Sequence, residues 1–242
     1  MARTTVPLTL DLYAELDSPC RACLFWECEP MHRSGLSAAE RTREKHAWIS
    51  QVLREWGSCG RIAMVDRRPV GYLIYAPAAL VPGAAAFPTA PVSADAVLMT
   101  TAWVDPSYDG DGLGRLLVQG MASDLVGRTG SRQANSRQGN SRQAGSREGS
   151  SIRAIEAFAR TRAAEPHHGA RGPCVLPADF LARVGFKTQR SHPRSPRMRM
   201  DMRSLVTWRD EFEAAWERLV DVVRRPSRHP APVPRDARSP RT

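Results

Sequence analysis

The segment from Ala96 to Leu125 contains the residues whose types and spacing most plainly indicate chemistry. A run of apolar and threonine residues over 96–104 predicts a buried strand, and a glycine-rich turn leads from it into an amphipathic helix predicted over 112–126. Glycines at 110, 112 and 114 let the backbone approach a ligand closely, and the first N–H groups of a helix have no partner within that helix. The segment therefore predicts a binding site for a phosphate-bearing ligand.

Three other ligand-binding motifs fail when they are tested on this segment. A dinucleotide fingerprint needs glycines spaced as G-x-G-x-x-G, which these are not. A calcium loop would run from Ser107 to Val118 and would lack both its first ligand and its bidentate glutamate. A nucleoside-triphosphate loop would need a lysine after the second glycine, and none is there.

The same residues resemble the signature of the GNAT superfamily of acetyl-CoA-dependent N-acetyltransferases. That signature is a strand, V-x-P, then [RQ]-x-x-G-x-[GA] and a helix, and Val104-Asp105-Pro106 and the run 109–114 stand in those places. A second mark of the superfamily is a short helix that ends in Gly-Phe before a strand, which residues 178–186 resemble. The order of predicted elements from 6 to 202 is also similar to that superfamily.

The resemblance implies a mixed α/β (α+β) fold. The expected architecture is a central, mostly antiparallel sheet with helices on both faces, a splayed strand pair at 96–104 and 152–158, and an appended C-terminal helix from Thr207. The pantetheine arm of the cofactor would lie between the splayed strands, with its pyrophosphate on the amides of the turn. The implied cofactor-binding residues are Trp103, Val104, Asp109, Gly110, Asp111, Gly112, Leu113, Gly114 and Arg115.

Two departures from the signature concern charge and proton transfer. Asp109 replaces the basic or amide residue of the superfamily and Asp111 adds a second negative charge, for which Arg115 is the nearby compensation. Leu181 stands where a tyrosine often protonates the leaving thiolate, and water would serve because a thiol of pKa near 8.5 leaves tolerably well.

The implied activity is transfer of an acetyl group from acetyl-CoA, as co-substrate, to an amine by direct attack. Glu156, on the second splayed strand, is the first candidate for the base and Glu27 is the second, with a solvent-exposed structural glutamate as the alternative for Glu156. Two other functions stay open. One is an acyl-CoA-binding protein of the same shape without chemistry, and the other is a nucleic-acid or partner-binding protein that uses arginine-rich arms.

The charge distribution argues against a nucleic-acid groove built into the fold. The net charge of +10 resides mostly in the serine, arginine and glutamine repeat around 129–151 and in the tail 224–242, so the remaining chain is near neutral. We expect a single domain over 1–223 that the repeat interrupts as a disordered insertion, followed by a disordered tail. The Trp-bearing terminal helix permits packing in a homodimer.

The chain has cysteines at 20, 23, 28, 59 and 174 and no export signal. An odd number of cysteines in such a chain favours reduced thiols. Cys20 and Cys23 have ligand-like spacing on one side only, and zinc usually needs a second pair, so no metal is expected. No apolar run reaches the length of a membrane span. The sequence therefore predicts a cytoplasmic protein.

Further elements follow from caps and periodicity. We expect a strand over 6–12, a helix that begins after Ser37 and ends before Gly57, and a hairpin of 61–65 with 70–75. A strand over 152–158, a short helix over 178–184 and one or two strands after 186 complete the order.

Overall fold

The computed structural model describes residues 2–138, 152–162, 168–169 and 172–202. Its helices are α1 (Leu10–Glu15), α2 (Ala38–Trp56), α3 (Leu113–Gln138) and α4 (Ala178–Arg183), with short 3₁₀ turns between strands. Its strands are β1 (Arg3–Pro7), β2 (Gly60–Val65), β3 (Arg68–Pro77), β4 (Ala96–Val104), β5 (Ala154–Arg160), β6 (His168–Gly169), β7 (Gly172–Pro173), β8 (Leu176–Pro177), β9 (Lys187–Arg190) and β10 (Arg197–Asp201).

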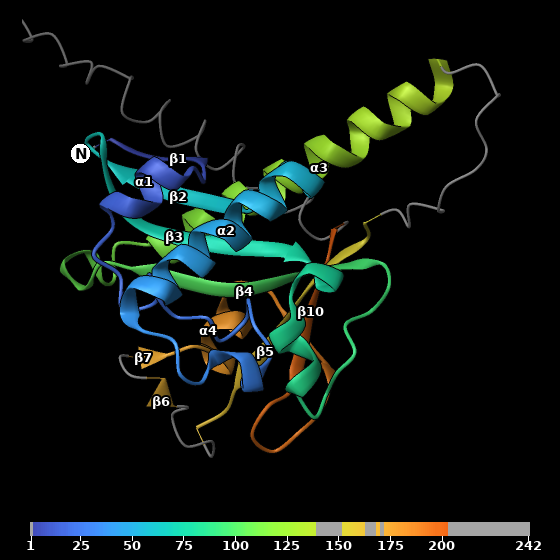
Figure 1. The fold of residues 1–242 in the computed structure, drawn as a ribbon. Helices are drawn as coiled ribbons and strands as arrows, with labels where there is room; N and C mark the ends of the chain where they lie inside the picture. Colours follow the sequence, from blue (N-terminus) through green and yellow to red (C-terminus); the bar gives the residue numbers. More distant parts are fainter. Residues whose placement is uncertain (1, 139–151, 163–167, 170–171, 203–242) are drawn as a thin grey trace, which may run out of the picture. The chain divides into compact units, whose positions relative to one another are not determined.

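Eight strands form one large sheet in the order β1-β2-β3-β4-β5-β10-β9, with β8 paired to the end of β5, and β6 and β7 form a separate antiparallel pair (Figure 1). Neighbours are antiparallel except for β4 with β5 and β5 with β8, which run parallel. The predicted mixed α/β fold with a mostly antiparallel sheet is confirmed. The parallel pair is possible because α3 forms the crossover between β4 and β5.

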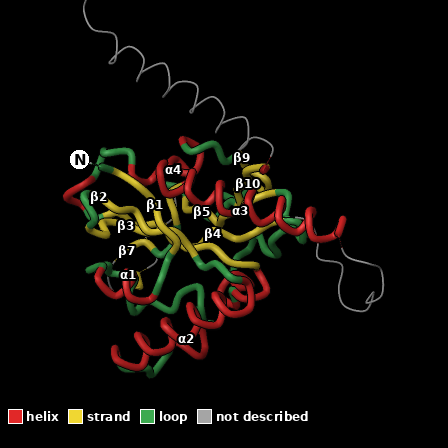
Figure 2. The backbone as a smooth tube through the Cα atoms, turned by 90° about the horizontal axis from the view of Figure 1, so that it is seen from above, coloured by secondary structure: helices red, strands yellow, loops and turns green. Residues whose placement is uncertain are grey.

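Helices cover both faces of the sheet (Figure 2). On one face, α1 and α2 bury Tyr13, Ile49 and Val52 against β3 and its neighbours. On the other face, α3 and α4 bury Leu117 and Leu181 with the opposite side chains of the same strands. Alternate strand residues therefore enter two separate apolar cores, which makes the register of each central strand strongly specified.

The start and the end of α2 follow the sequence signals. Ser37 Oγ accepts the Glu40 N–H at 3.3 Å, and the Glu40 carboxylate accepts the Ser37 N–H at 2.8 Å, which completes a capping box. Gly57 ends the helix with φ of 80°, a left-handed conformation that glycine adopts without a steric penalty.

Two element predictions were wrong. The strand predicted over 6–12 ends at Pro7, because Thr9 accepts the Leu12 N–H and caps a short helix that starts at Leu10. The helix predicted to stop at 126 continues to Gln138, so the first ten residues of the predicted disordered insertion are helical. That stretch contains no proline and several residues of high helix propensity, so the helix that begins at Leu113 extends through it.

The rest of the repeat, the helix predicted from Thr207 and the tail lie outside the described residues. Within the described ranges, no helix combines the length and the apolar composition needed to cross a bilayer.

Candidate functional site

The strands β4 and β5 separate soon after they begin. They pair over three residues only, with Leu98 opposite Glu156 as the last pair. At that point β4 carries an extra residue, because Met99 and Thr101 face consecutive residues of β3 and Thr100 has no opposite partner there. A bulge of this kind bends its strand and raises its twist, so β4 turns away from β5. The predicted splay is therefore present in the structure (Figure 1).

The edge of β4 along this gap presents backbone groups from alternate residues. Asp105 donates its N–H to Val70 C=O at 2.8 Å, so the opposed pair of Trp103 and Tyr72 exchanges ladder hydrogen bonds. The backbone groups of Val104 consequently point away from β3 and into the gap. Of the two residues predicted to pair with a pantetheine arm, Val104 is the one that the ladder directs toward it.

The turn between β4 and α3 is open. Within the part of the chain that the structure describes, the N–H groups of Gly112, Leu113 and Gly114 donate to no acceptor, and the first helical bond runs from Leu116 N–H to Gly112 C=O at 3.1 Å. Gly110 and Gly112 have φ of 82° and 78°, and a Cβ added at either position would meet no atom within 4 Å. Three donors without an acceptor among the described residues therefore lie at the positive end of a helix, beside the open surroundings of Gly112, which favours an anion.

The two acidic residues of this turn are partly compensated. Arg3, from β1, bonds the Asp111 carboxylate at 3.1 Å and the Asp111 C=O at 2.6 Å. Asp109 accepts the N–H of Gly110 at 3.0 Å, which leaves the three donors beyond it uncovered. Arg115 is exposed in the first turn of α3. The charge on Asp111 is therefore neutralised from a strand that is remote in sequence.

Glu156 is fully buried, and the alternative of a solvent-exposed glutamate does not hold. One carboxylate oxygen accepts from Arg199 at 3.2 Å, and the other accepts the Ser93 N–H at 3.1 Å and lies 3.4 Å from Arg197 Nε. Two guanidinium groups therefore flank the buried Glu156 carboxylate. This placement favours a structural role that anchors the loop before β4 to β5 and β10.

Glu27 is also buried, in an ion pair with Lys45 of α2. Burial raises the pKa of Glu27, and Lys45 opposes that shift. Oε2 of Glu27 has no hydrogen-bond partner among the described residues, whereas the Lys45 ammonium also donates to Cys23 C=O at 3.2 Å. The pair therefore fixes the chain segment that follows α1 against α2. The two predicted catalytic carboxylates thus sit in separate ion-pair clusters.

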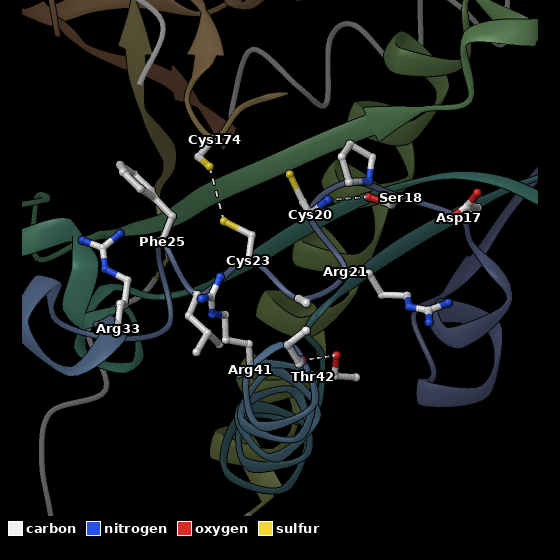
Figure 3. A pocket seen from close by; sticks show the side chains of 14 residues that line it. Asp17, Ser18, Cys20, Arg21, Cys23, Phe25, Arg33, Arg41, Thr42 and Cys174 are labelled. Atoms are coloured by element: carbon white, nitrogen blue, oxygen red, sulfur yellow. Dashed lines mark hydrogen bonds between the residues drawn. The ribbon is translucent and has the colours of Figure 1, made fainter. Parts of the chain in front are cut away.

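A pocket of about 690 Å³ opens between that segment and α2 (Figure 3). Its lining is residues 17–25, Arg33, Ala38, Arg41, Thr42 and Cys174. Ser18, on its wall, bonds the Tyr72 hydroxyl at 2.9 Å, and the Tyr72 ring lies 6.0 Å from the Trp103 ring. Cys174 stands two residues before β8, which pairs with the end of β5.

Several residues of this region gave no signal in the sequence. Arg3, Lys45, Arg197 and Arg199 each pair with an acid far away along the chain. Cys174 is distant from Cys20 and Cys23, and sequence spacing did not associate them. A lysine at position 45, on the apolar face of α2, is a feature that helical periodicity could have found.

Comparison with known proteins gives matches among solved structures alone. No protein-family model and no curated protein matches the chain. Similar structures include aminoglycoside acetyltransferase AAC(6')-Ib in complex with coenzyme A, with 15% identity over 86% of this chain and 99% of that one and a TM-score of 0.49. The PaiA N-acetyltransferase of Thermoplasma acidophilum, also in complex with coenzyme A, has 12% identity over 83% and 99% and a TM-score of 0.46.

A third similar structure is the ribosomal-protein-S18-alanine N-acetyltransferase of Escherichia coli. It has 12% identity over 83% of this chain and 94% of that one, with a TM-score of 0.41. These three are N-acetyltransferases or acetyltransferases by name. The likeness concerns the fold.

Glu156→Gln tests whether the carboxylate is structural. The substitution leaves two largely buried guanidinium groups without their shared counter-charge, so we expect a loss of about 3 kcal/mol in the free energy of unfolding by urea. Asp201→Asn is the matched control, because Asp201 pairs with the same Arg199 but is 61% exposed, and we expect a loss below about 1 kcal/mol. Unchanged stability with lower turnover would instead support Glu156 as the base.

Proposed function

We propose that this protein is an N-acetyltransferase of the GNAT type, which transfers an acetyl group from acetyl-CoA to an amine. The observation that carries the proposal is the row of N–H groups at Gly112, Leu113 and Gly114 that have no acceptor among the described residues, in the turn that leads from β4 into α3. The motif that runs through the same residues, and the second motif at 178–186, support the same assignment.

The chain offers distinct groups to the two halves of the cofactor. The amides of the turn would hold the pyrophosphate, with Arg115 alongside and Arg3 neutralising Asp111. The backbone groups of Val104 would pair with the pantetheine amides as a strand would, because β5 no longer occupies that edge. The thioester would then lie in the gap, beside the pocket that Cys174 lines.

The reaction requires one new bond and one broken bond. The acceptor nitrogen forms a bond to the acetyl carbonyl carbon, the carbon–sulfur bond breaks, and the coenzyme leaves as a thiolate. A base removes one proton from the nitrogen and the thiolate gains one. Leu181 lies fully buried in the apolar core, so the thiolate would take its proton from water in this proposal.

Glu27 fits the role of base better than Glu156 does. One Glu27 oxygen has no hydrogen-bond partner in the described ranges, and burial raises the pKa of this carboxylate. Lys45 would hold it in position. Glu156, by contrast, has both oxygens engaged by Arg199, Ser93 and the nearby Arg197.

The charge of the pocket favours an acceptor that carries an anionic group beside its amine. Arg21, Arg33 and Arg41 line the pocket, and Asp17 is the single acidic residue among the described residues of its wall. The net positive lining would attract a carboxylate and repel a polyamine. Amino acids and peptide termini therefore fit the pocket better than multiply charged cations do.

A second candidate function is an acyl-CoA-binding protein that performs no transfer. It is favoured by Leu181 in place of a tyrosine and by the engagement of both predicted carboxylates in ion pairs. Both functions use the same coenzyme-binding site, and they differ only in whether the acetyl group is transferred.

Binding of coenzyme A should depend on the conformation of Gly112. Gly112→Ala places a side chain at φ of 78°, where it strains the turn by about 1–2 kcal/mol, and we expect at least tenfold weaker binding by calorimetry. Gly35→Ala is the matched control, since Gly35 has φ of 91°, equally open surroundings and no part in the turn. If both variants bound coenzyme A with equal affinity, the turn would not be the coenzyme-binding site.

Arg3 should support coenzyme binding through Asp111. Arg3→Met leaves the Asp111 charge uncompensated near the pyrophosphate, which at a hydrated site costs about 1 kcal/mol, or about fivefold in affinity. The double variant with Asp111→Asn should regain the lost affinity, and added salt should reduce the difference. A double variant as weak as Arg3→Met would show that Arg3 acts in another way.

Release of the coenzyme thiol with a panel of amines tests the transfer itself. We expect acetyl-CoA to be consumed with amino-acid or peptide amines in preference to polyamines, because of the arginine-lined pocket. Binding of acetyl-CoA without thiol release for any amine would support the non-catalytic alternative. If acetyl-CoA did not bind at all, both the transferase and the non-catalytic binding function would be excluded.

A further inference from the structure

Three thiols from two distant parts of the sequence meet at the wall of the pocket (Figure 3). The sulfur atoms of Cys23 and Cys174 lie 3.3 Å apart, and Cys20 lines the same pocket wall. All five cysteines are free rather than joined in disulfides. A disulfide needs a separation of about 2.05 Å, so a shift of little more than 1 Å would join the first two.

The surroundings of Cys23 favour its ionised form. Hydrogen bonding with the Cys174 sulfur, which lies 3.3 Å away, holds the pKa of Cys23 well below its usual range. The Lys45 ammonium, bonded to the Cys23 carbonyl oxygen, adds a positive charge nearby. Thiolates are the nucleophilic form of cysteine, so Cys23 is the reactive member of the group.

Cys20, Cys23 and Cys174 also differ from the buried Cys59 in their accessibility to small molecules. Cys20, Cys23 and Cys174 all line the pocket, and Cys23 is half-buried rather than enclosed. Cys59 lies outside the pocket lining with 1% of its surface exposed, and burial raises its pKa to about 12. Small oxidants can therefore reach the first group and not the second.

The sulfur spacing suits a dithiol better than a metal centre. Two thiolates on one tetrahedral zinc ion lie about 3.8 Å apart, given zinc–sulfur bonds of about 2.3 Å. The separation of 3.3 Å is shorter, and no group of three metal-ligating side chains arranged as a metal site occurs in the described residues.

We propose that Cys23 and Cys174 form a peroxide-reactive dithiol site in which Cys23 is the attacking thiolate and Cys174 the resolving thiol. The Cys23 thiolate attacks one oxygen of hydrogen peroxide, and the O–O bond breaks. Hydroxide departs as the leaving group, and Cys23 becomes a sulfenic acid. The Cys174 sulfur then attacks the Cys23 sulfur, and water leaves as the disulfide forms. The two sulfurs lose two electrons in total, and the peroxide oxygens gain them.

This disulfide would tie the segment after α1 to the segment before α4. The Trp26 indole already donates to Cys174 C=O at 2.8 Å, so the two segments are held in contact in the reduced protein. Because the new bond would lie in the pocket wall, oxidation would fix the shape of that wall. The site is independent of the proposed acetyl transfer.

Peroxide treatment of the reduced full chain, followed by thiol blocking and peptide mapping, tests the site. We expect a Cys23–Cys174 linkage that dithiothreitol reverses and that Cys23→Ser abolishes. Cys59→Ser is the matched control and should oxidise as the wild type does. The wild type gives a second measurement that needs no variant, because iodoacetamide should label Cys23 at least tenfold faster than Cys59 at pH 6.

Other results would overturn the proposal. A linkage through Cys20 in place of Cys23, oxidation of Cys59 at the same rate, or equal labelling of Cys23 and Cys59 would each contradict it. Stoichiometric zinc in the purified protein, lost together with these thiols, would show a metal centre instead.

Discussion

The extra residue in β4 is the constraint on which the candidate site depends. Without Thr100, β4 would continue beside β5, and its outer edge would be occupied by ladder hydrogen bonds. With it, the two strands diverge after Leu98, and the edge that leads to the glycine turn stays available. The same divergence places the first amides of α3 at one end of the gap. One inserted residue thus sets where β4 stops pairing with β5.

Buried ion pairs hold the segments around this gap. Glu156 with its two arginines fastens the loop before β4, and Lys45 with Glu27 fastens the segment after α1. Such pairs contribute little net stability, because desolvation offsets attraction, but breaking one leaves an uncompensated charge. They therefore specify position more than they stabilise the fold. Both predicted catalytic carboxylates belong to these pairs, so their positions in the sequence did not separate a structural carboxylate from a base.

Local signals determined much of the architecture from the sequence alone. The capping box at Ser37 and the glycine at 57 set the limits of α2, and the apolar run over 96–104 with its glycine turn set β4 and the start of α3. These features are local because caps, turns and periodicity involve residues within a few positions of one another. The mixed sheet and its splayed pair followed from the motif at 104–114. The strand predicted over 6–12 was wrong because Thr9, a helix cap, has little meaning until its neighbours are placed.

The tertiary structure alone decided the electrostatics and the thiol chemistry of the site. Arg3 reaches Asp111 across more than a hundred residues, and Cys174 meets Cys23 across a similar span. Sheet order and crossover direction create these contacts, and no local spacing encodes them. The choice between Trp103 and Val104 at the gap also required the strand register, because a shift of one residue reverses which backbone groups face outward. The sequence therefore determined which residues line the turn, and only the folded chain determined which of their groups are left unpaired, since pairing depends on partners that are remote in sequence.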